Sequence, residues 1–146
     1  MNIQLSNVRW LRVVLTAVLV VVLNYVLVTL LVTVYAFVLS FQARGAPDQA
    51  QITQFANQFA PWATPLLGIL LTFGAAVWVA RKVETAPQLH GWLVGLFVAI
   101  IGLLLAVVFG GAEDLFADLL WFVVTIVAGG VGGMLGARRK LQPAHQ

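Results

Sequence analysis

Four long apolar segments constrain this sequence more than any other feature. They cover residues 13–38, 62–80, 91–109 and 115–135, and Asp118 is the one charged residue within them. A helix needs about 20 apolar residues to cross a hydrocarbon core of about 30 Å. Because an unpaired backbone is costly in lipid, each segment is expected to be helical. The sequence therefore predicts an all-α integral membrane protein, a four-helix bundle that forms one transmembrane domain over residues 1–146.

The composition agrees with a membrane protein and excludes several other classes. Apolar residues make up 62% of the chain and charged residues 9%, whereas soluble domains carry about 25% charged residues. These figures exclude a soluble enzyme, a disordered chain and a coiled coil. Cysteine is absent, which excludes disulfides and thiolate ligands. The net charge is +3, and the basic residues lie beside the apolar segments. They are therefore expected to set the orientation of the chain in the membrane and not to bind nucleic acid, and the expected partner is the lipid bilayer.

The basic residues predict how the chain crosses the membrane. Seven of the eight lie before the first segment, between the second and third, or after the fourth, and only Arg44 lies on the other side. Cytoplasmic loops carry the excess of Lys and Arg, so both termini are expected in the cytoplasm, with a C-terminal tail over residues 138–146. A cleaved signal peptide is disfavoured because its apolar region is only about 7–15 residues long. The seven residues are Arg9, Arg12, Arg81, Lys82, Arg138, Arg139 and Lys140.

The longest loop on the outer side has helical features of its own. Pro47 and Asp48 are typical of a helix start, and Ile52, Phe55 and Phe59 follow at spacings of three and four. Residues 47–60 are therefore predicted to form a short amphipathic helix on the outer surface. An irregular cap over the bundle is the alternative.

Small residues recur along one face of the third segment. They are spaced by four, four, three, four and four residues, which places them within an arc of about 100° on a helix. Inside lipid, small residues hold helices together because they let backbones approach closely. We therefore expect this face to pack against another helix. Its residues are Gly91, Gly95, Ala99, Gly102 and Ala106, with Gly110 just after the segment.

The fourth and second segments carry matching patterns. Gly129 with Gly133, and Gly132 with Gly136, form two G-x-x-x-G pairs, the spacing of helix-dimerisation faces. The second segment repeats a small residue every fourth position, at Thr64, Gly68, Thr72, Ala76 and Ala80. The first segment is rich in valine and nearly lacks small residues, so it is expected at the periphery of the bundle or against a partner protein.

A resemblance follows from the glycine patterns and the basic pairs after the second and fourth segments. The sequence Gly74-Ala75-Ala76, the pair His90-Gly91 and the run 129–138 resemble a group of small, four-span bacterial inner-membrane proteins of uncharacterised function. The resemblance covers residues 66–140. It implies the four-span architecture and a bacterial cytoplasmic membrane, and no activity.

Few polar residues are candidates for chemistry. Asn24 is the one strongly polar side chain deep in a segment, and it is expected to hydrogen-bond to another helix, with contact to a substrate or ion as the alternative. Glu113, Asp114 and Asp118 form an acidic cluster. Its carboxylates either complement the dipole of the fourth helix or hold a cation.

No pattern in the sequence predicts catalysis. His90 is expected to lie at the membrane interface, with a ligand or pH-sensing role as the alternative. We find no paired histidines, no serine beside a base and no phosphate-binding loop, so no enzyme, cofactor or metal is predicted. The leading hypothesis is a non-catalytic structural or interaction module that contacts another membrane protein or a second copy. The alternative is a small oligomeric transporter or channel.

Overall fold

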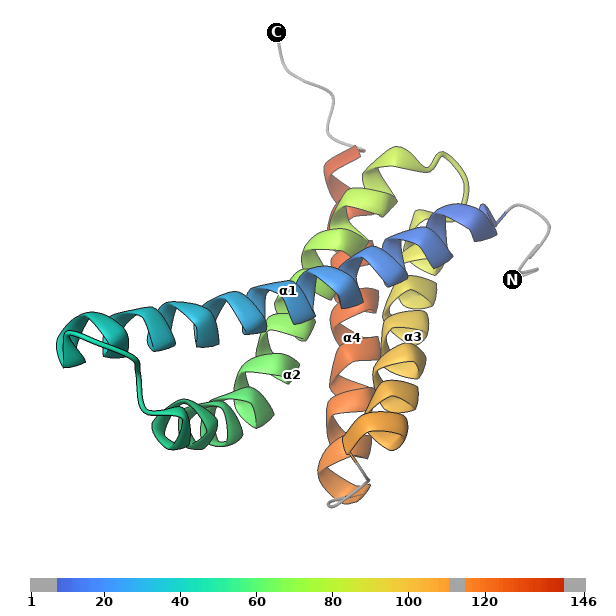
Figure 1. Cartoon of the computed structure of the whole chain (residues 1–146). Helices are drawn as coiled ribbons and strands as arrows, with labels where there is room; N and C mark the ends of the chain where they lie inside the picture. Colours follow the sequence, from blue (N-terminus) through green and yellow to red (C-terminus); the bar gives the residue numbers. More distant parts are fainter. Residues whose placement is uncertain (1–7, 111–114, 141–146) are drawn as a thin grey trace, which may run out of the picture.

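The structure is a computed structural model that describes residues 8–110 and 115–140. Its elements are α1 (Trp10–Ala43), α2 (Gln49–Lys82), α3 (Pro87–Leu105), a short π-helical turn η2 (Ala106–Gly110) and α4 (Leu115–Lys140). The described residues contain helices and the connections between them, which confirms the prediction of an all-α fold (Figure 1).

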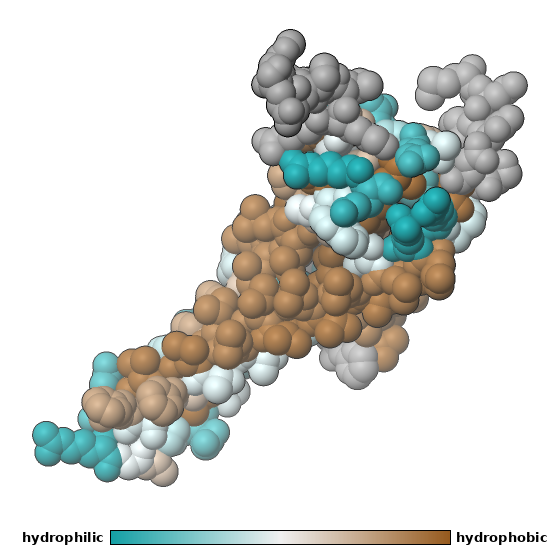
Figure 2. Space-filling view, turned by 90° about the horizontal axis from the view of Figure 1, so that it is seen from above, coloured by the Kyte–Doolittle hydropathy of each residue, from teal (hydrophilic) through white to brown (hydrophobic). Residues whose placement is uncertain are grey.

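All four predicted apolar segments lie in helices that are long and apolar enough to cross a membrane. These helices leave large apolar side chains exposed along their length, and Figure 2 shows an apolar surface that covers most of the visible face. Exposed apolar side chains over the whole length of a helix suit a lipid environment. The fold is that of a multi-pass membrane protein.

The helices do not all lie parallel. The C-terminal part of α2, α3 and α4 pack side by side, whereas α1 crosses α2 and α3 obliquely (Figure 1). The buried residues of α1 lie between Val13 and Val28. The second half of α1 therefore extends away from the three packed helices.

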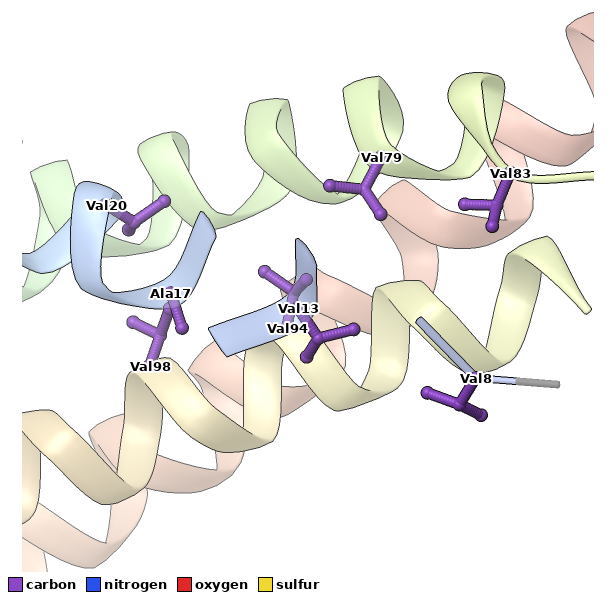
Figure 3. Packing of buried hydrophobic residues seen from close by; sticks show 8 residues of the cluster. All are labelled: Val8, Val13, Ala17, Val20, Val79, Val83, Val94 and Val98. Atoms are coloured by element: carbon purple, nitrogen blue, oxygen red, sulfur yellow. The ribbon is translucent and has the colours of Figure 1, made fainter. Parts of the chain in front are cut away.

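A valine cluster holds α1 in its crossing position. Val13 and Ala17 of α1 lie between Val79 of α2 and Val94 and Val98 of α3 (Figure 3). Valine is short and has restricted side-chain freedom, so it lets the three helices approach while losing little entropy on burial. The cluster explains why the first segment, which nearly lacks small residues, still packs closely at its N-terminal half.

The predicted outer helix proves to be part of a longer one. Residues 49–60 form the first turns of α2, which continues without interruption through Pro61 and Pro65, so the expectation of a separate surface helix is wrong. The carboxylate of Asp48 accepts a hydrogen bond of 2.9 Å from the Ala50 N–H and caps the start of α2. The direction of the α2 ribbon changes between its first turns and the rest (Figure 1), as expected where proline removes backbone N–H donors.

The apolar face of the first turns of α2 packs against α1. Phe55 stacks on Tyr35 of α1 with ring centroids 3.8 Å apart, and Phe59 stacks on Phe55 at 5.1 Å. Ser40 donates to the Gly45 carbonyl in the connection between the helices. We call residues 29–60, which comprise the second half of α1 and the first turns of α2, the arm.

The remaining boundaries differ slightly from the predicted ones. The third apolar segment was expected over residues 91–109, and α3 begins earlier, at Pro87, and gives way to the π-helical turn at Ala106. α4 continues to Lys140, so the first three residues of the predicted tail 138–146 are helical. The sequence placed helix ends where hydropathy falls, whereas a helix at a membrane interface continues until a cap or proline ends it.

Candidate functional site

Direct backbone contact joins α3 to α4. A Cβ atom added to Gly91 would lie 2.5 Å from the Gly133 Cα and 2.7 Å from the Gly129 carbonyl oxygen. A Cβ on Gly95 would lie 3.0 Å from the carbonyl oxygens of Thr125 and Ile126. Only hydrogen atoms fit in these positions, so glycine at Gly91 and Gly129 sets the distance between the two helices.

A second contact of the same kind joins α4 to α2. A Cβ on Gly132 would lie 2.6 Å from the Phe73 carbonyl oxygen, and one on Gly136 would lie 2.7 Å from the Cβ of Ala80. Ala76 and Ala80 are fully buried. The small residues of the second and fourth segments therefore face each other, and α4 lies between α2 and α3.

Two members of the predicted packing face lie elsewhere. Gly102 is exposed, with no atom within 4 Å of a built Cβ, and Ala106 is half-buried in the π-helical turn. The prediction that Gly102 packs against another helix is wrong, because the contact between α3 and α4 at Gly91 and Gly95 does not reach it. Both residues instead border a groove.

Sequence reasoning missed Gly130. A Cβ at this position would collide with the indole ring of Trp92, so the glycine makes room for the ring beside α4. The sequence does contain the two neighbouring pairs, Gly129-Gly130 and Gly91-Trp92. The role of Gly130 could be inferred only after the structure showed that these turns of α4 and α3 face each other.

The groove lies among all four helices and has a volume of about 810 Å³. The segments that border it diverge beyond the crossing of α1 (Figure 1). Its walls are mostly apolar and aromatic. The polar side chains that line it are Asn24, Tyr25, Asn57, Thr64, Asp118 and Thr125.

Asn24 is the most deeply placed polar group of this groove. Its side chain is 8% exposed, and Nδ2 donates a 3.0 Å hydrogen bond to the Thr64 carbonyl of α2. Gly68 provides the space, since a Cβ there would lie 3.4 Å from Asn24 Nδ2. The interhelical hydrogen bond expected from the sequence is thus formed, and its acceptor is a backbone carbonyl.

The other half of the Asn24 amide has no partner. Oδ1 is buried and accepts no hydrogen bond from the described residues. Rotating the amide by 180° would not help, because Oδ1 would then face the Thr64 carbonyl oxygen, which cannot donate. An unsatisfied buried acceptor is costly.

We expect Asn24→Leu to change the free energy of unfolding by less than about 1 kcal/mol. The variant loses one hydrogen bond but also removes the unsatisfied Oδ1, so the two effects oppose each other. Unfolding of the purified protein by sodium dodecyl sulfate in mixed micelles, followed by circular dichroism, measures the difference. A loss well above that value would mean that the Asn24–Thr64 bond stabilises the fold more than its geometry indicates.

The acidic cluster is only partly within the described residues. Asp118 lies in the first turn of α4 and lines the groove, whereas Glu113 and Asp114 lie outside the described residues. The position of Asp118 complements the helix dipole. Among the described residues there is no group of three or more side chains able to hold a metal ion, and cation binding by the whole cluster stays a prediction.

Two threonine hydroxyl groups at or near the groove are already hydrogen-bonded within their own helices. Thr125 donates to the Trp121 carbonyl at 2.8 Å, and Thr72 donates to the Gly68 carbonyl at 2.6 Å. Such bonds to the preceding turn satisfy hydroxyl groups within their own helix. Among the other polar side chains that line the groove, Asp118 is the charged one, and Asn24 is the one with a buried oxygen that lacks a donor in the described residues.

His90 lies away from the groove and joins two helices. It is fully buried between the helices, and its expected place at the membrane interface stays a prediction. Nδ1 lies 3.0 Å from the Ala86 carbonyl oxygen, and Nε2 lies 3.2 Å from the Arg9 backbone nitrogen. The Ala86 carbonyl oxygen can only accept, so Nδ1 carries the ring proton and donates to it. Nε2 is then unprotonated and accepts from the Arg9 backbone N–H. His90 therefore fixes the start of α1 against the start of α3.

Comparisons of the chain with protein-family models, curated proteins and solved structures found no match.

Proposed function

We propose that this protein is a non-catalytic interaction module of the bacterial cytoplasmic membrane, with both termini in the cytoplasm. The observation that carries the proposal is the arm. After Val28, α1 contributes no fully buried residue, and Phe37 and Phe41 are 70% and 80% exposed. A rigid apolar helix that leaves the packed core offers a surface for another membrane protein or a second copy.

The charge distribution supports the proposed orientation. Arg12 donates to the Lys82 carbonyl at 3.5 Å, and Arg9 contacts His90, so the start of α1 lies beside the connection from α2 to α3. Hydrophilic residues gather at this end of the molecule (Figure 2). Positive residues at one end favour the cytoplasm for that end. The resemblance to small four-span bacterial proteins supports the same membrane.

Because the chain has no cysteine, single cysteines can test the orientation directly. We expect a membrane-impermeant thiol reagent to label Arg44→Cys in intact cells and to label Arg138→Cys only after permeabilisation. Labelling of Arg138→Cys in intact cells would contradict the proposed orientation.

The same approach tests the arm. A cysteine at Phe41 is expected to cross-link in native membranes, either to a second copy, giving about twice the 15.8 kDa mass of the chain, or to a different protein. The matched control is Leu104→Cys on α3, a residue that is 60% exposed and is expected to give no such adduct. Equal cross-linking at both positions, or none at Phe41, would contradict the proposal that the arm is the contact surface.

The second candidate function is a small oligomeric transporter or channel. It is favoured by one observation, the groove of about 810 Å³ that contains Asn24 and Asp118. Flux of a solute into proteoliposomes that is lost in Asn24→Leu, in a variant that still folds, would establish transport in place of the interaction role.

A further inference from the structure

The groove combines apolar walls with a carboxylate and a buried amide oxygen that lacks a donor in the described residues. Its apolar lining comes from all four helices and includes Val20, Val21, Val98 and Leu103. Within it, the Oδ1 atom of Asn24 lacks a donor, and Asp118 supplies a carboxylate. Apolar side chains are poor neighbours for water alone, and a carboxylate and an amide are poor neighbours for a lipid chain alone. The lining therefore suits a ligand with both an apolar and a polar part.

We propose that the groove binds a lipophilic ammonium compound, an apolar chain that carries a protonated amine. The ammonium group is recognised by the Asp118 carboxylate, and one of its N–H groups, or another donor of the ligand, is recognised by Asn24 Oδ1. The apolar chain lies against the valine and leucine side chains. This inference goes beyond the proposed interaction role and does not depend on it.

Charge explains why the ligand is a cation. The basic residues Arg9, Arg12, Arg81 and Lys82 lie at the other end of the helices. Arg44 follows the end of α1 and does not line the groove, so among the described residues Asp118 is the charged group that lines it. In a medium of low dielectric constant a carboxylate attracts a cation strongly and repels an anion. A fatty-acid anion of the same length is therefore excluded.

The aromatic residues of the groove favour the same ligand class. Tyr25, Trp121 and Phe122 line it together with Asp118. The faces of aromatic rings attract cations, and ammonium ligands are commonly bound by a carboxylate with surrounding rings. Neither a neutral lipid chain nor an anion would gain from these rings in this way.

Gly102 keeps the groove open. It borders the groove, and a Cβ added to it meets no atom within 4 Å. A larger side chain at this position would therefore occupy the space of the ligand without a collision with the protein. This provides a variant that blocks the site while the helix packing is retained.

The test measures binding of dodecylammonium to the full-length protein in lipid nanodiscs, with binding to empty nanodiscs subtracted. We expect saturable binding that is weakened at least about tenfold by Asp118→Asn, as for loss of a hydrogen-bonded charge pair. The matched control is Asp48→Asn, which removes one carboxylate outside the groove and keeps a residue able to cap α2; its dissociation constant should equal that of the wild type. Gly102→Leu should abolish binding while size-exclusion and circular dichroism profiles stay unchanged.

Two further probes separate charge from hydrogen bonding. Dodecyltrimethylammonium carries the same charge without an N–H donor, so Asn24→Leu should weaken binding of dodecylammonium and leave that of dodecyltrimethylammonium unchanged. Dodecanoate should not bind. The proposal is overturned if dodecanoate binds as tightly as dodecylammonium, if Gly102→Leu binds like the wild type, or if Asp118→Asn and Asp48→Asn have the same effect.

Discussion

Adding one methyl group at Gly91 is expected to lower the free energy of unfolding by about 1–3 kcal/mol, the range for overpacking of a close contact. In Gly91→Ala the new Cβ would lie 2.5 Å from the Gly133 Cα, which forces α3 and α4 apart. The movement would also disturb Gly95, which relies on the same separation. Unfolding by sodium dodecyl sulfate in mixed micelles gives the free-energy difference.

The chain provides two matched controls for this substitution. A Cβ built on Gly74 or on Gly102 has no atom within 4 Å, so Gly74→Ala and Gly102→Ala should be neutral or stabilise the helix by up to about 1 kcal/mol. If Gly91→Ala were as stable as these controls, close contact of the backbones would not be what holds α3 to α4.

Replacement of His90 by alanine is expected to cost about 2–4 kcal/mol of stability, because it empties a fully buried site and leaves the Arg9 N–H unpaired. The loss should be local at first, at the start of α1, since His90 is the residue that accepts from Arg9. Hydrogen exchange of the backbone amides of residues 9–13, together with global unfolding, measures both effects.

Two other substitutions at His90 separate packing from hydrogen bonding. His90→Leu refills the volume without an acceptor, whereas His90→Gln offers a carbonyl oxygen to the Arg9 N–H. We expect slower amide exchange at residues 9–13 in the glutamine variant than in the leucine variant. Equal exchange in the two would assign the role of His90 to packing alone.

The sequence could predict those features that depend on one helix at a time. Each apolar segment was long enough to form a helix, and the spacing of glycines showed which residues share a face. The contacts of Gly91 with Gly133 and of Gly136 with Ala80 followed once those faces met. Asn24 was expected to hydrogen-bond to another helix because an amide without a partner is costly in hydrocarbon.

Other features depended on how the helices are placed along and across one another. Residues that share a face of a helix need not all contact the same neighbouring helix. The sequence therefore could not show that Gly95 contacts α4 and that Gly102 does not. The predicted outer helix over residues 47–60 and the second apolar segment proved to be one helix, because α2 continues through Pro61 and Pro65 and a helix can lose single N–H donors without ending. The groove was not predictable from any one segment, because four distant parts of the chain border it.

The two prolines of α2 lie where the arm meets the groove. Pro61 and Pro65 both border the groove, at the place where α2 lacks two backbone donors and bends most easily. The stacked rings of Tyr35, Phe55 and Phe59 join the second half of α1 to the first turns of α2 within the arm. If the arm changed its angle at these prolines, the width of the groove would change as well. A molecule bound in the groove and a protein bound to the arm would then alter each other's affinity by the same factor.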